Sequence, residues 1–160
     1  MSIEIATKKA IFDLSVTTED LLTEEGLETA VVISLFTDRR AASTDPLPDG
    51  ETDRRGCWMD ATLDALSNGQ SDHGIGSLLW LLNREKTVPS VLARAKQYAE
   101  QALEWLVSDK IAESITVTAE RLGPAGNNWL ALSIEIARPA KPAMAFRYDY
   151  NWTAQAYRAA

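Results

Sequence analysis

Two Asp-Arg-Arg triplets carry the side chains of this chain that are best suited to specific polar binding. Asp38-Arg39-Arg40 precedes a loop rich in proline, aspartate and glycine, and Asp53-Arg54-Arg55 follows it. Each guanidinium is a planar fork of donors that matches a carboxylate or backbone carbonyls. The triplets do not form an evident catalytic set, and we interpret them as a means of holding acidic or carbonyl groups.

Two interpretations of these four arginines stay open. In one, Asp–Arg pairs fasten the loop to its own protein. In the other, the forks bind a neighbouring subunit, and a tryptophan provides an aromatic anchor, because Arg and Trp are enriched at interface hot spots. The partner-binding residues of this region would then be Arg39, Arg40, Arg54, Arg55 and Trp58. A long loop without secondary structure, as expected over 41–56, favours a function or a clamping partner.

The chain has few groups that suit nucleophilic or metal chemistry. Its one histidine, His73, stands in a polar turn, far in sequence from its one cysteine, Cys57. A Cys–His pair would need hydrogen-bond contact and an orienting third group, for which Asp60 or Asp72 are candidates. One His and one Cys cannot form a typical structural zinc site, and neither glycine-rich nucleotide-binding motif occurs. We therefore expect no cofactor, no metal and no catalytic residue.

Carboxylates are numerous, and a hydrolase of the lysozyme type would use two of them across a cleft. The strongest candidates cluster near the expected start of a helix: Glu19, Asp20, Glu24, Glu25 and Glu28. That position is ordinary for helix capping and solubility. We expect a protein that is not an enzyme, with the hydrolase as the alternative.

Length and composition are those of an ordinary globular domain. The 160 residues are 46% hydrophobic and 24% charged, which predicts one domain over 1–160 with a sizeable core. The net charge of −7 disfavours binding to nucleic acid or to an anionic membrane surface. No apolar run approaches the roughly 20 residues that span a bilayer, and the first residues lack the apolar segment of a signal peptide. A single cysteine suits a reducing cytoplasm.

Hydrophobic periodicity predicts helices before residue 110. One helix begins near Thr23, although the β-branched run 31–33 would also suit a buried strand. Residues 78–82 predict a short apolar helix. The clearest element begins at Pro89 and ends near Asp109, with apolar residues three or four apart. Residues 1–18 alternate weakly, which predicts one or two short strands or an extended arm.

The period changes to two after the long helix. Residues 114–122 and 129–137 alternate apolar and polar side chains, and the Gly/Asn-rich loop between them predicts a β-hairpin. Pro139 and Pro142 are expected to end the second strand. The predicted fold class is α+β: N-terminal helices and one long amphipathic helix pack on a small antiparallel sheet, formed by the C-terminal hairpin and a third strand.

The tail alternates once more and places an apolar stripe on one side. Its members are Met144, Phe146, Tyr148, Tyr150 and Trp152. The stripe is either the third strand of the sheet or an edge that pairs with another chain through unpaired backbone groups. We treat 143–160 as a candidate partner-binding tail, and we expect its removal to leave the helical core folded.

The chain resembles the baseplate proteins of Mu-like phages, a family akin to the baseplate wedge subunits and sheath initiators of the protein W type. The resemblance runs from about residue 10 to residue 153. It is carried by Glu24-Glu25-Gly26-Leu27, by the run 29–41, by 45–50, by Asp53-Arg54-Arg55-Gly56 with Trp58 and Asp60, and by 76–86. The two arginine triplets are its most specific part.

This resemblance implies a structural role without chemistry. A protein of this family lies in the baseplate wedge around the tail tube, its sheet resembles the interlocking domain of the sheath subunit, and it templates the first sheath ring. The implied partners are other baseplate wedge proteins and the tail sheath subunit, in an assembly with several copies. The implied location is the tail baseplate of the virion, assembled in the cytoplasm of the bacterial host. A cytoplasmic adaptor domain is a further alternative.

Overall fold

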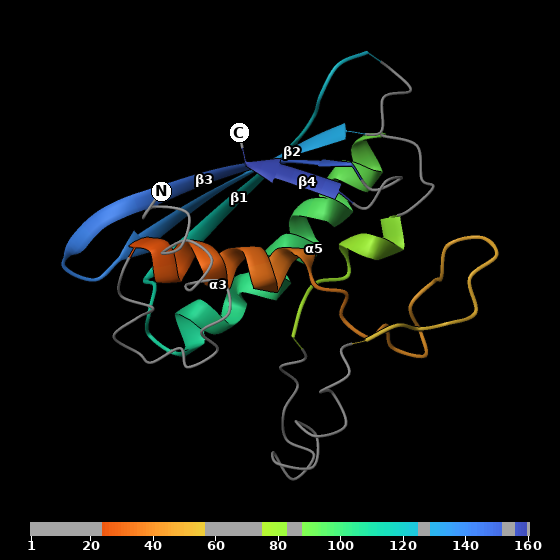
Figure 1. The fold of residues 1–160 in the computed structure, drawn as a ribbon, viewed down its shortest axis with the longest axis horizontal. Helices are drawn as coiled ribbons and strands as arrows, with labels where there is room; N and C mark the ends of the chain where they lie inside the picture. Colours follow the sequence, from red (N-terminus) through yellow and green to blue (C-terminus); the bar gives the residue numbers. More distant parts are fainter. Residues whose placement is uncertain (1–23, 57–74, 83–87, 125–128, 152–155, 160) are drawn as a thin grey trace, which may run out of the picture.

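The computed structural model describes residues 24–56, 75–82, 88–124, 129–151 and 156–159. Its elements are the helix α3 (Glu24–Phe36), the 3₁₀ helix η1 (Leu79–Leu82), the helix α5 (Pro89–Ser108), and the strands β1 (Ser114–Arg121), β2 (Trp129–Arg138), β3 (Lys141–Asn151) and β4 (Ala156–Ala159). The strands form one antiparallel sheet in the order β1-β2-β3-β4. Helices α3 and α5 lie on one face of it (Figure 1), so the predicted α+β class is confirmed.

Helix α3 follows the helical period despite its β-branched residues. Glu24 and Glu25 occupy its first turn, where the helix dipole favours carboxylates. Val31 is fully buried, whereas Ile33 is 43% exposed. A strand would place these two side chains on the same face, so the observed burial is that of a helix. The helix prediction for this segment is confirmed over the strand alternative.

Helix α5 is the predicted long amphipathic helix. Pro89 suits its first turn, because the fixed φ is helical and the missing N–H would have no partner there. Its buried face consists of three alanines and three larger apolar residues, namely Val91, Ala95, Ala99, Ala102, Leu103 and Leu106. On one flank Trp105 Nε1 donates a hydrogen bond of 3.0 Å to Ser34 Oγ of α3. Helix α5 therefore packs on the sheet and is joined to α3 on that flank.

The inner strand β2 contributes a row of buried side chains to the core. One face of it is buried at every second residue, at Leu130, Leu132, Ile134 and Ile136. The register opposes these to the tail stripe, at Tyr150, Tyr148, Phe146 and Met144. Cross-strand pairs of this kind are the main stabilising contacts of a sheet. The predicted hairpin and third strand are thus confirmed.

Two features of the sheet differ from the prediction. Strand β3 already includes Pro142, because Ala140 adopts a left-handed conformation (φ 54°) and turns the chain back directly after β2. Arg138 secures this turn through Nε and Nη2, which donate to Pro142 O at 3.1 and 2.9 Å. A fourth strand, β4, was not predicted. It pairs with β3, and its Tyr157 stacks on Phe36 of α3 with ring centroids 4.0 Å apart.

Several sequence predictions fall outside the described residues. These are the extended segments over 1–18, and the residues Cys57, Trp58, Asp60, Asp72, His73 and Trp152. The Trp58 anchor and the place of Trp152 in the tail stripe therefore stay predictions, as does the expectation that Cys57 and His73 form no catalytic pair.

Candidate functional site: an arginine-locked loop and the sheet edge

The loop between α3 and Gly56 is anchored where it begins. Asp38 forms an isolated parallel bridge with Ser77, in which Arg39 N donates to Ser77 O at 3.0 Å and Ser77 N donates to Thr37 O at 2.9 Å. Ser77 Oγ also donates to Leu35 O at 2.5 Å, at the end of α3. The chain that leaves α3 is thus joined to the segment that leads into η1.

Gly76 is required by this junction. Its φ of +100° is a conformation that residues with a side chain rarely adopt. A Cβ at this position would lie 2.2 Å from Thr37 O and 2.8 Å from Thr37 C, both backbone atoms. Only glycine allows the two segments to approach this closely.

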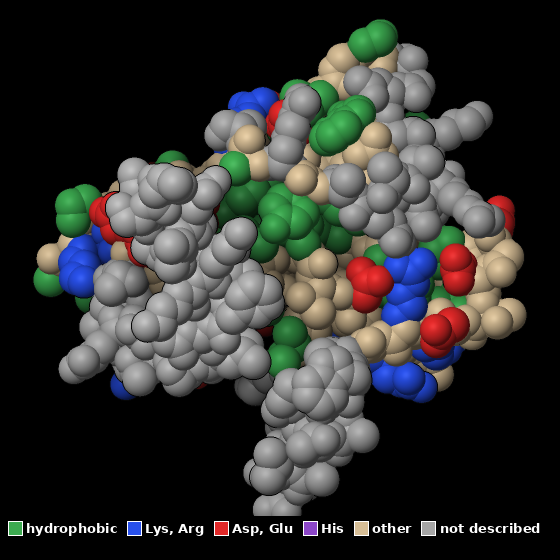
Figure 2. Space-filling model, viewed as in Figure 1, with side chains coloured by type: hydrophobic (Ala, Val, Ile, Leu, Met, Phe, Trp, Pro, Cys, Tyr) green, Lys and Arg blue, Asp and Glu red, His purple; other side chains and the backbone are tan. Residues whose placement is uncertain are grey.

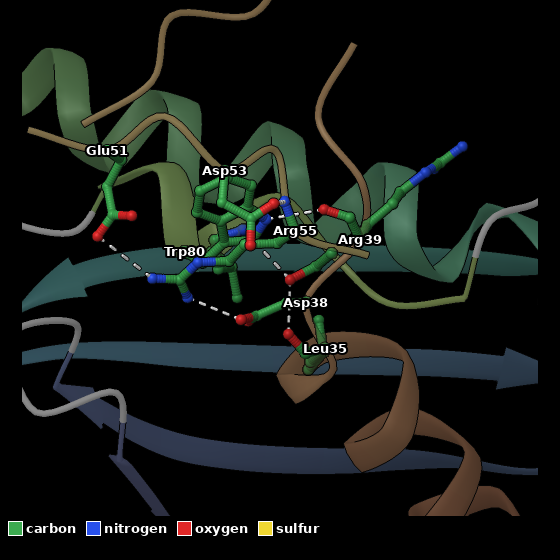
Figure 3. Close-up of polar contacts among 9 residues, drawn as sticks. Leu35, Asp38, Arg39, Glu51, Asp53, Arg55 and Trp80 are labelled. Atoms are coloured by element: carbon green, nitrogen blue, oxygen red, sulfur yellow. Dashed lines mark hydrogen bonds and ion pairs between the residues drawn. The ribbon is translucent and has the colours of Figure 1, made fainter. Parts of the chain in front are cut away.

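Arg55 makes the side-chain contacts that hold the two ends of the loop together. Its Nη1 donates to Asp38 Oδ2 at 2.7 Å, and its Nη2 lies 3.8 Å from Glu51 Oε1. The guanidinium carbon lies 4.6 Å from the ring centroid of Trp80, a cation–π geometry. Trp80 is almost fully buried and donates from Nε1 to Arg39 O at 2.8 Å. Figure 3 shows these groups converging, so one guanidinium connects both ends of the loop to η1.

Arg54 holds the middle of the loop through backbone carbonyls. Its guanidinium donates to Ala42 O, to Ser43 O at 3.2 Å and to Asp45 O at 3.3 Å. The backbone adds a bond of 2.9 Å from Ala41 N to Arg54 O. The second triplet therefore closes the loop on itself, as the internal interpretation of the arginines expected.

The first triplet is placed differently. Arg40 is exposed and makes one long bond, 3.4 Å, from Nη1 to Arg55 O. The side chain of Arg39 extends away from the Asp38–Arg55 pair (Figure 3), while its carbonyl accepts from Trp80. Acidic and basic side chains lie next to one another over the loop in the space-filling view (Figure 2). Arg54 and Arg55 thus bond within the loop, whereas Arg40 is exposed and the half-buried Arg39 turns away from the Asp38–Arg55 pair. We call Arg39 and Arg40 the outward pair, and their similar sequence contexts did not indicate this difference.

The tail stripe lies on the core face of β3. Tyr148 is 1% exposed and Tyr150 is 5% exposed, while Met144 and Phe146 are half-buried. Phe36 contacts both tyrosines, edge-on at 5.4 Å and stacked at 5.6 Å. Any contact of β3 with a partner would therefore involve its backbone rather than the tyrosine rings. Removing 143–160 would take Tyr148 and Tyr150 out of the core cluster, and the expectation that the helical core stays folded without this tail stays a prediction.

The outer edge of β3 is only partly covered. Strand β4 pairs with Tyr148 to Asn151. No strand of the described chain pairs on that side with the preceding residues 142–147. Pro142 lacks an N–H group, so the backbone edge that a further strand can join is residues 143–147.

The buried tyrosines are not suited to proton chemistry. Burial raises the pKa of Tyr150 to about 12, with Asp38 adding to the rise and Arg55 opposing it. Burial also raises the pKa of Tyr148, assisted by the charge of Glu28. Both phenols are therefore neutral at physiological pH. The Tyr148 hydroxyl has no hydrogen-bond partner within the described part of the chain.

Neither a metal site nor a membrane span is found in the residues that the structure describes. No group of three or more His, Cys, Asp or Glu side chains comes together there. None of the described helices combines the length and the apolar character that crossing a bilayer demands.

The comparisons with known proteins define the family. Residues 27–143 match the model of the family described as Phage protein GP46. The baseplate protein gp46 of Escherichia phage Mu is 49% identical over 120 residues, which are 75% of each chain. The Mu-like prophage FluMu protein gp46 of Haemophilus influenzae is 42% identical over 107 residues, 67% of each chain. No solved structure matches significantly.

The chain therefore belongs to the Phage protein GP46 family. The resemblance to the baseplate proteins of Mu-like phages is confirmed. The matched range contains α3 from Leu27 onward, the whole arginine loop, η1, α5, β1, β2 and the first three residues of β3.

Proposed function

We propose that this chain is a structural component of the baseplate of a contractile phage tail, where it joins wedge proteins and starts the assembly of the sheath. The observation that carries the proposal is the 49% identity to a protein named as the Mu baseplate protein. A structural role also suits the chemistry of the site, because Arg54 and Arg55 are engaged in locking contacts.

The locked loop supplies a rigid polar surface for a neighbouring subunit. Arg54 and Arg55 hold the loop backbone and so remove most of the entropy that docking would otherwise cost. Arg40 of the outward pair, which is exposed, then presents its guanidinium group to acidic or carbonyl groups of a wedge protein, with Arg39 next to it in the chain. In this arrangement the two interpretations of the arginines are complementary.

The uncovered part of β3 supplies the second contact. A strand of the sheath subunit would add to the outer edge of residues 143–147 by main-chain hydrogen bonds. Because β3 is fixed by β2 and by its buried tyrosines, the edge is rigid before the partner binds. Several copies around the tail tube would then offer a ring of such edges.

The other sequence-based alternatives receive no support from the described residues. Glu24, Glu25 and Glu28 are exposed on α3, in the positions expected for capping and solubility. The candidates Glu19 and Asp20 lie outside the described residues, and the lysozyme-type hydrolase and the cytoplasmic adaptor stay alternatives.

The proposal is tested by co-expressing the tagged chain with the tail sheath subunit and the neighbouring wedge protein of the same phage. The perturbed variant carries Arg39→Glu and Arg40→Glu. The control carries Lys96→Glu and Lys110→Glu, which give the same change in net charge on exposed positions elsewhere. If the outward pair forms a hot spot, capture of the wedge protein falls by about 30-fold or more in the first variant only. Failure of the wild-type chain, folded and soluble, to capture either protein would refute the proposal.

A further inference from the structure

The flank of α5 that faces away from α3 carries a row of exposed side chains. On the other flank, Trp105 bonds to α3 and Tyr98 packs against the cluster around Trp80. The members of the row recur every three or four residues, so they lie on one stripe of the helix. We call this stripe the outer flank of α5, and it consists of Ala93, Lys96, Gln97, Glu100, Glu104 and Val107.

Exposed apolar side chains stand at both ends of α5. Val88, directly before the helix, is 41% exposed, and Val107, in its last turn, is 39% exposed. Only two other large apolar side chains of the described residues are exposed to this extent. Val107 also lines a groove of about 380 Å³ along the outer flank, together with Ile115 of β1. Covering these side chains would remove apolar surface from water, which favours association.

The charges of the outer flank are ordered along the helix. Its one cation, Lys96, precedes its two carboxylates, Glu100 and Glu104. Lys96 lies 3.7 Å from Glu100 of its own helix, but both side chains are about half exposed, so this pair contributes little. A helix that runs in the opposite direction presents the reverse order, with acidic groups before the basic one. A second copy of α5 in antiparallel orientation is therefore complementary in charge to the first.

One alignment of two antiparallel copies matches the charged and the apolar positions together. With a twofold axis at the height of residue 98, Lys96 faces Glu100 of the second copy, because each lies two residues from the axis. Val107 then faces the start of the second helix, next to Val88, because positions 89 and 107 each lie nine residues from the axis. The same alignment thus covers the exposed valines and pairs the opposite charges.

The position at the twofold axis is also suited to self-contact. Every side chain there meets its own copy, so a charge would repel itself. Gln97 is the member of the outer flank closest to the axis, and its amide both donates and accepts hydrogen bonds. We infer that two copies of this chain pair through the outer flanks of α5, antiparallel about this axis, and form a dimer of the free protein.

The pairing should be weak. Helix α5 has 20 residues and is therefore about 30 Å long. A contact between two single helices of this length falls below about 1,200 Å² of buried surface, which is the class of transient interfaces. The net charge of −7 on each copy opposes association, but physiological salt screens it beyond about 8 Å, whereas facing side chains are in contact. We expect a dissociation constant of about 10–100 µM.

The pair is separate from the surfaces of the proposed function. The arginine loop lies over Trp80, on the flank of α5 that carries Tyr98. A twofold axis does not relate copies that point the same way around one tail axis. On the proposed function, the dimer therefore belongs to the chain before assembly, and incorporation into the baseplate separates the pair. Loss of the dimer through Lys96→Glu should then leave capture of the wedge protein unchanged.

Charge exchange tests the alignment, with sedimentation velocity of the purified full chain as the readout. Lys96→Glu places a carboxylate opposite Glu100 of the second copy and should weaken the dimer by about tenfold or more. Lys96→Glu with Glu100→Lys exchanges the charges in both copies and should return the dissociation constant to within about threefold of the wild type. The control, Arg147→Glu, makes the same change in net charge as Lys96→Glu, on an exposed residue of β3; it should also stay within about threefold.

NMR identifies the surface that associates. As the chain is concentrated, the amide signals of the outer flank and of the residues next to Val88 should shift in proportion to the dimer fraction. The amides of residues 143–147 at the edge of β3 should not shift, because the pair is formed by helices.

Four results would overturn the inference. They are a wild-type chain that stays monomeric up to about 500 µM, a Lys96→Glu variant that associates like the wild type, an exchanged variant that does not recover, and concentration-dependent shifts confined to the strands. Because the assay uses the purified chain alone, such a failure leaves the co-expression result unaffected. Conversely, a failed co-expression with an intact dimer would refute only the proposed function.

Discussion

Replacing Arg55 with alanine separates internal locking from partner binding. The side chain of Arg55 is 20% exposed and that of its partner Asp38 is 44% exposed, so the ion pair is only partly screened by solvent. We assign about 0.5–1 kcal/mol to this pair and about 0.5–1 kcal/mol to the contact with Trp80. Alanine would keep the left-handed backbone of Arg55 (φ 54°), so the strain at this position stays nearly the same.

The expected loss in the free energy of unfolding is therefore about 1–2 kcal/mol, which for a chain of this size lowers Tm by about 3–6 °C. Urea denaturation and calorimetry measure it. Arg40→Ala is the control, because Arg40 is exposed and makes one bond of 3.4 Å; its effect should stay within about 0.5 kcal/mol. A double-mutant cycle of Asp38→Asn and Arg55→Gln should give a coupling of about 0.5 kcal/mol or more. If Arg55→Ala left stability unchanged but abolished capture of a partner, the locking account would be refuted.

Two further predictions concern the loop junction and the core. Gly76→Ala should destabilise the fold by about 2 kcal/mol or more, because both its φ and the contact with Thr37 O would be strained; a urea midpoint equal to that of the wild type would contradict this. Burial raises the folded-state pKa of Tyr150 to about 12, above the unfolded value near 10. Stability should therefore be constant below about pH 10 and fall as pH rises above it, because the unfolded state loses the proton first. Tyr150→Phe should make this fall in stability less steep in urea titrations without abolishing it, because burial raises the pKa of Tyr148 as well; an unchanged slope would show that Tyr150 does not contribute.

The elements with a long and regular pattern were predictable from the sequence. Helix α5 and strand β2 each bury residues at a constant period, and both were located to within about two residues. The stripe of β3 was also recognised, because Tyr148 and Tyr150 continue that alternation. For these segments the period alone identifies the buried face.

The remaining features depend on contacts between distant segments. Strand β4 has only four residues, too few for an alternation to be distinguished from chance, and it is placed by pairing with β3 and by the stack of Tyr157 on Phe36. Trp80 was assigned to a short apolar helix, and nothing local indicates that it lies under Arg55. Likewise, the inward direction of Arg54 and the outward direction of Arg39 follow from how the loop returns to η1. The arginine triplets could be found from the sequence, but their division of roles could not.

The central claim is a structural role in the tail baseplate. It is tested most directly by deleting the gene from the phage or prophage that encodes it and examining the particles by electron microscopy. The account predicts particles without a sheathed tail, restored by the wild-type chain in trans and not by the Arg39→Glu, Arg40→Glu variant. Complete sheathed tails with normal baseplates in the deletion would contradict it.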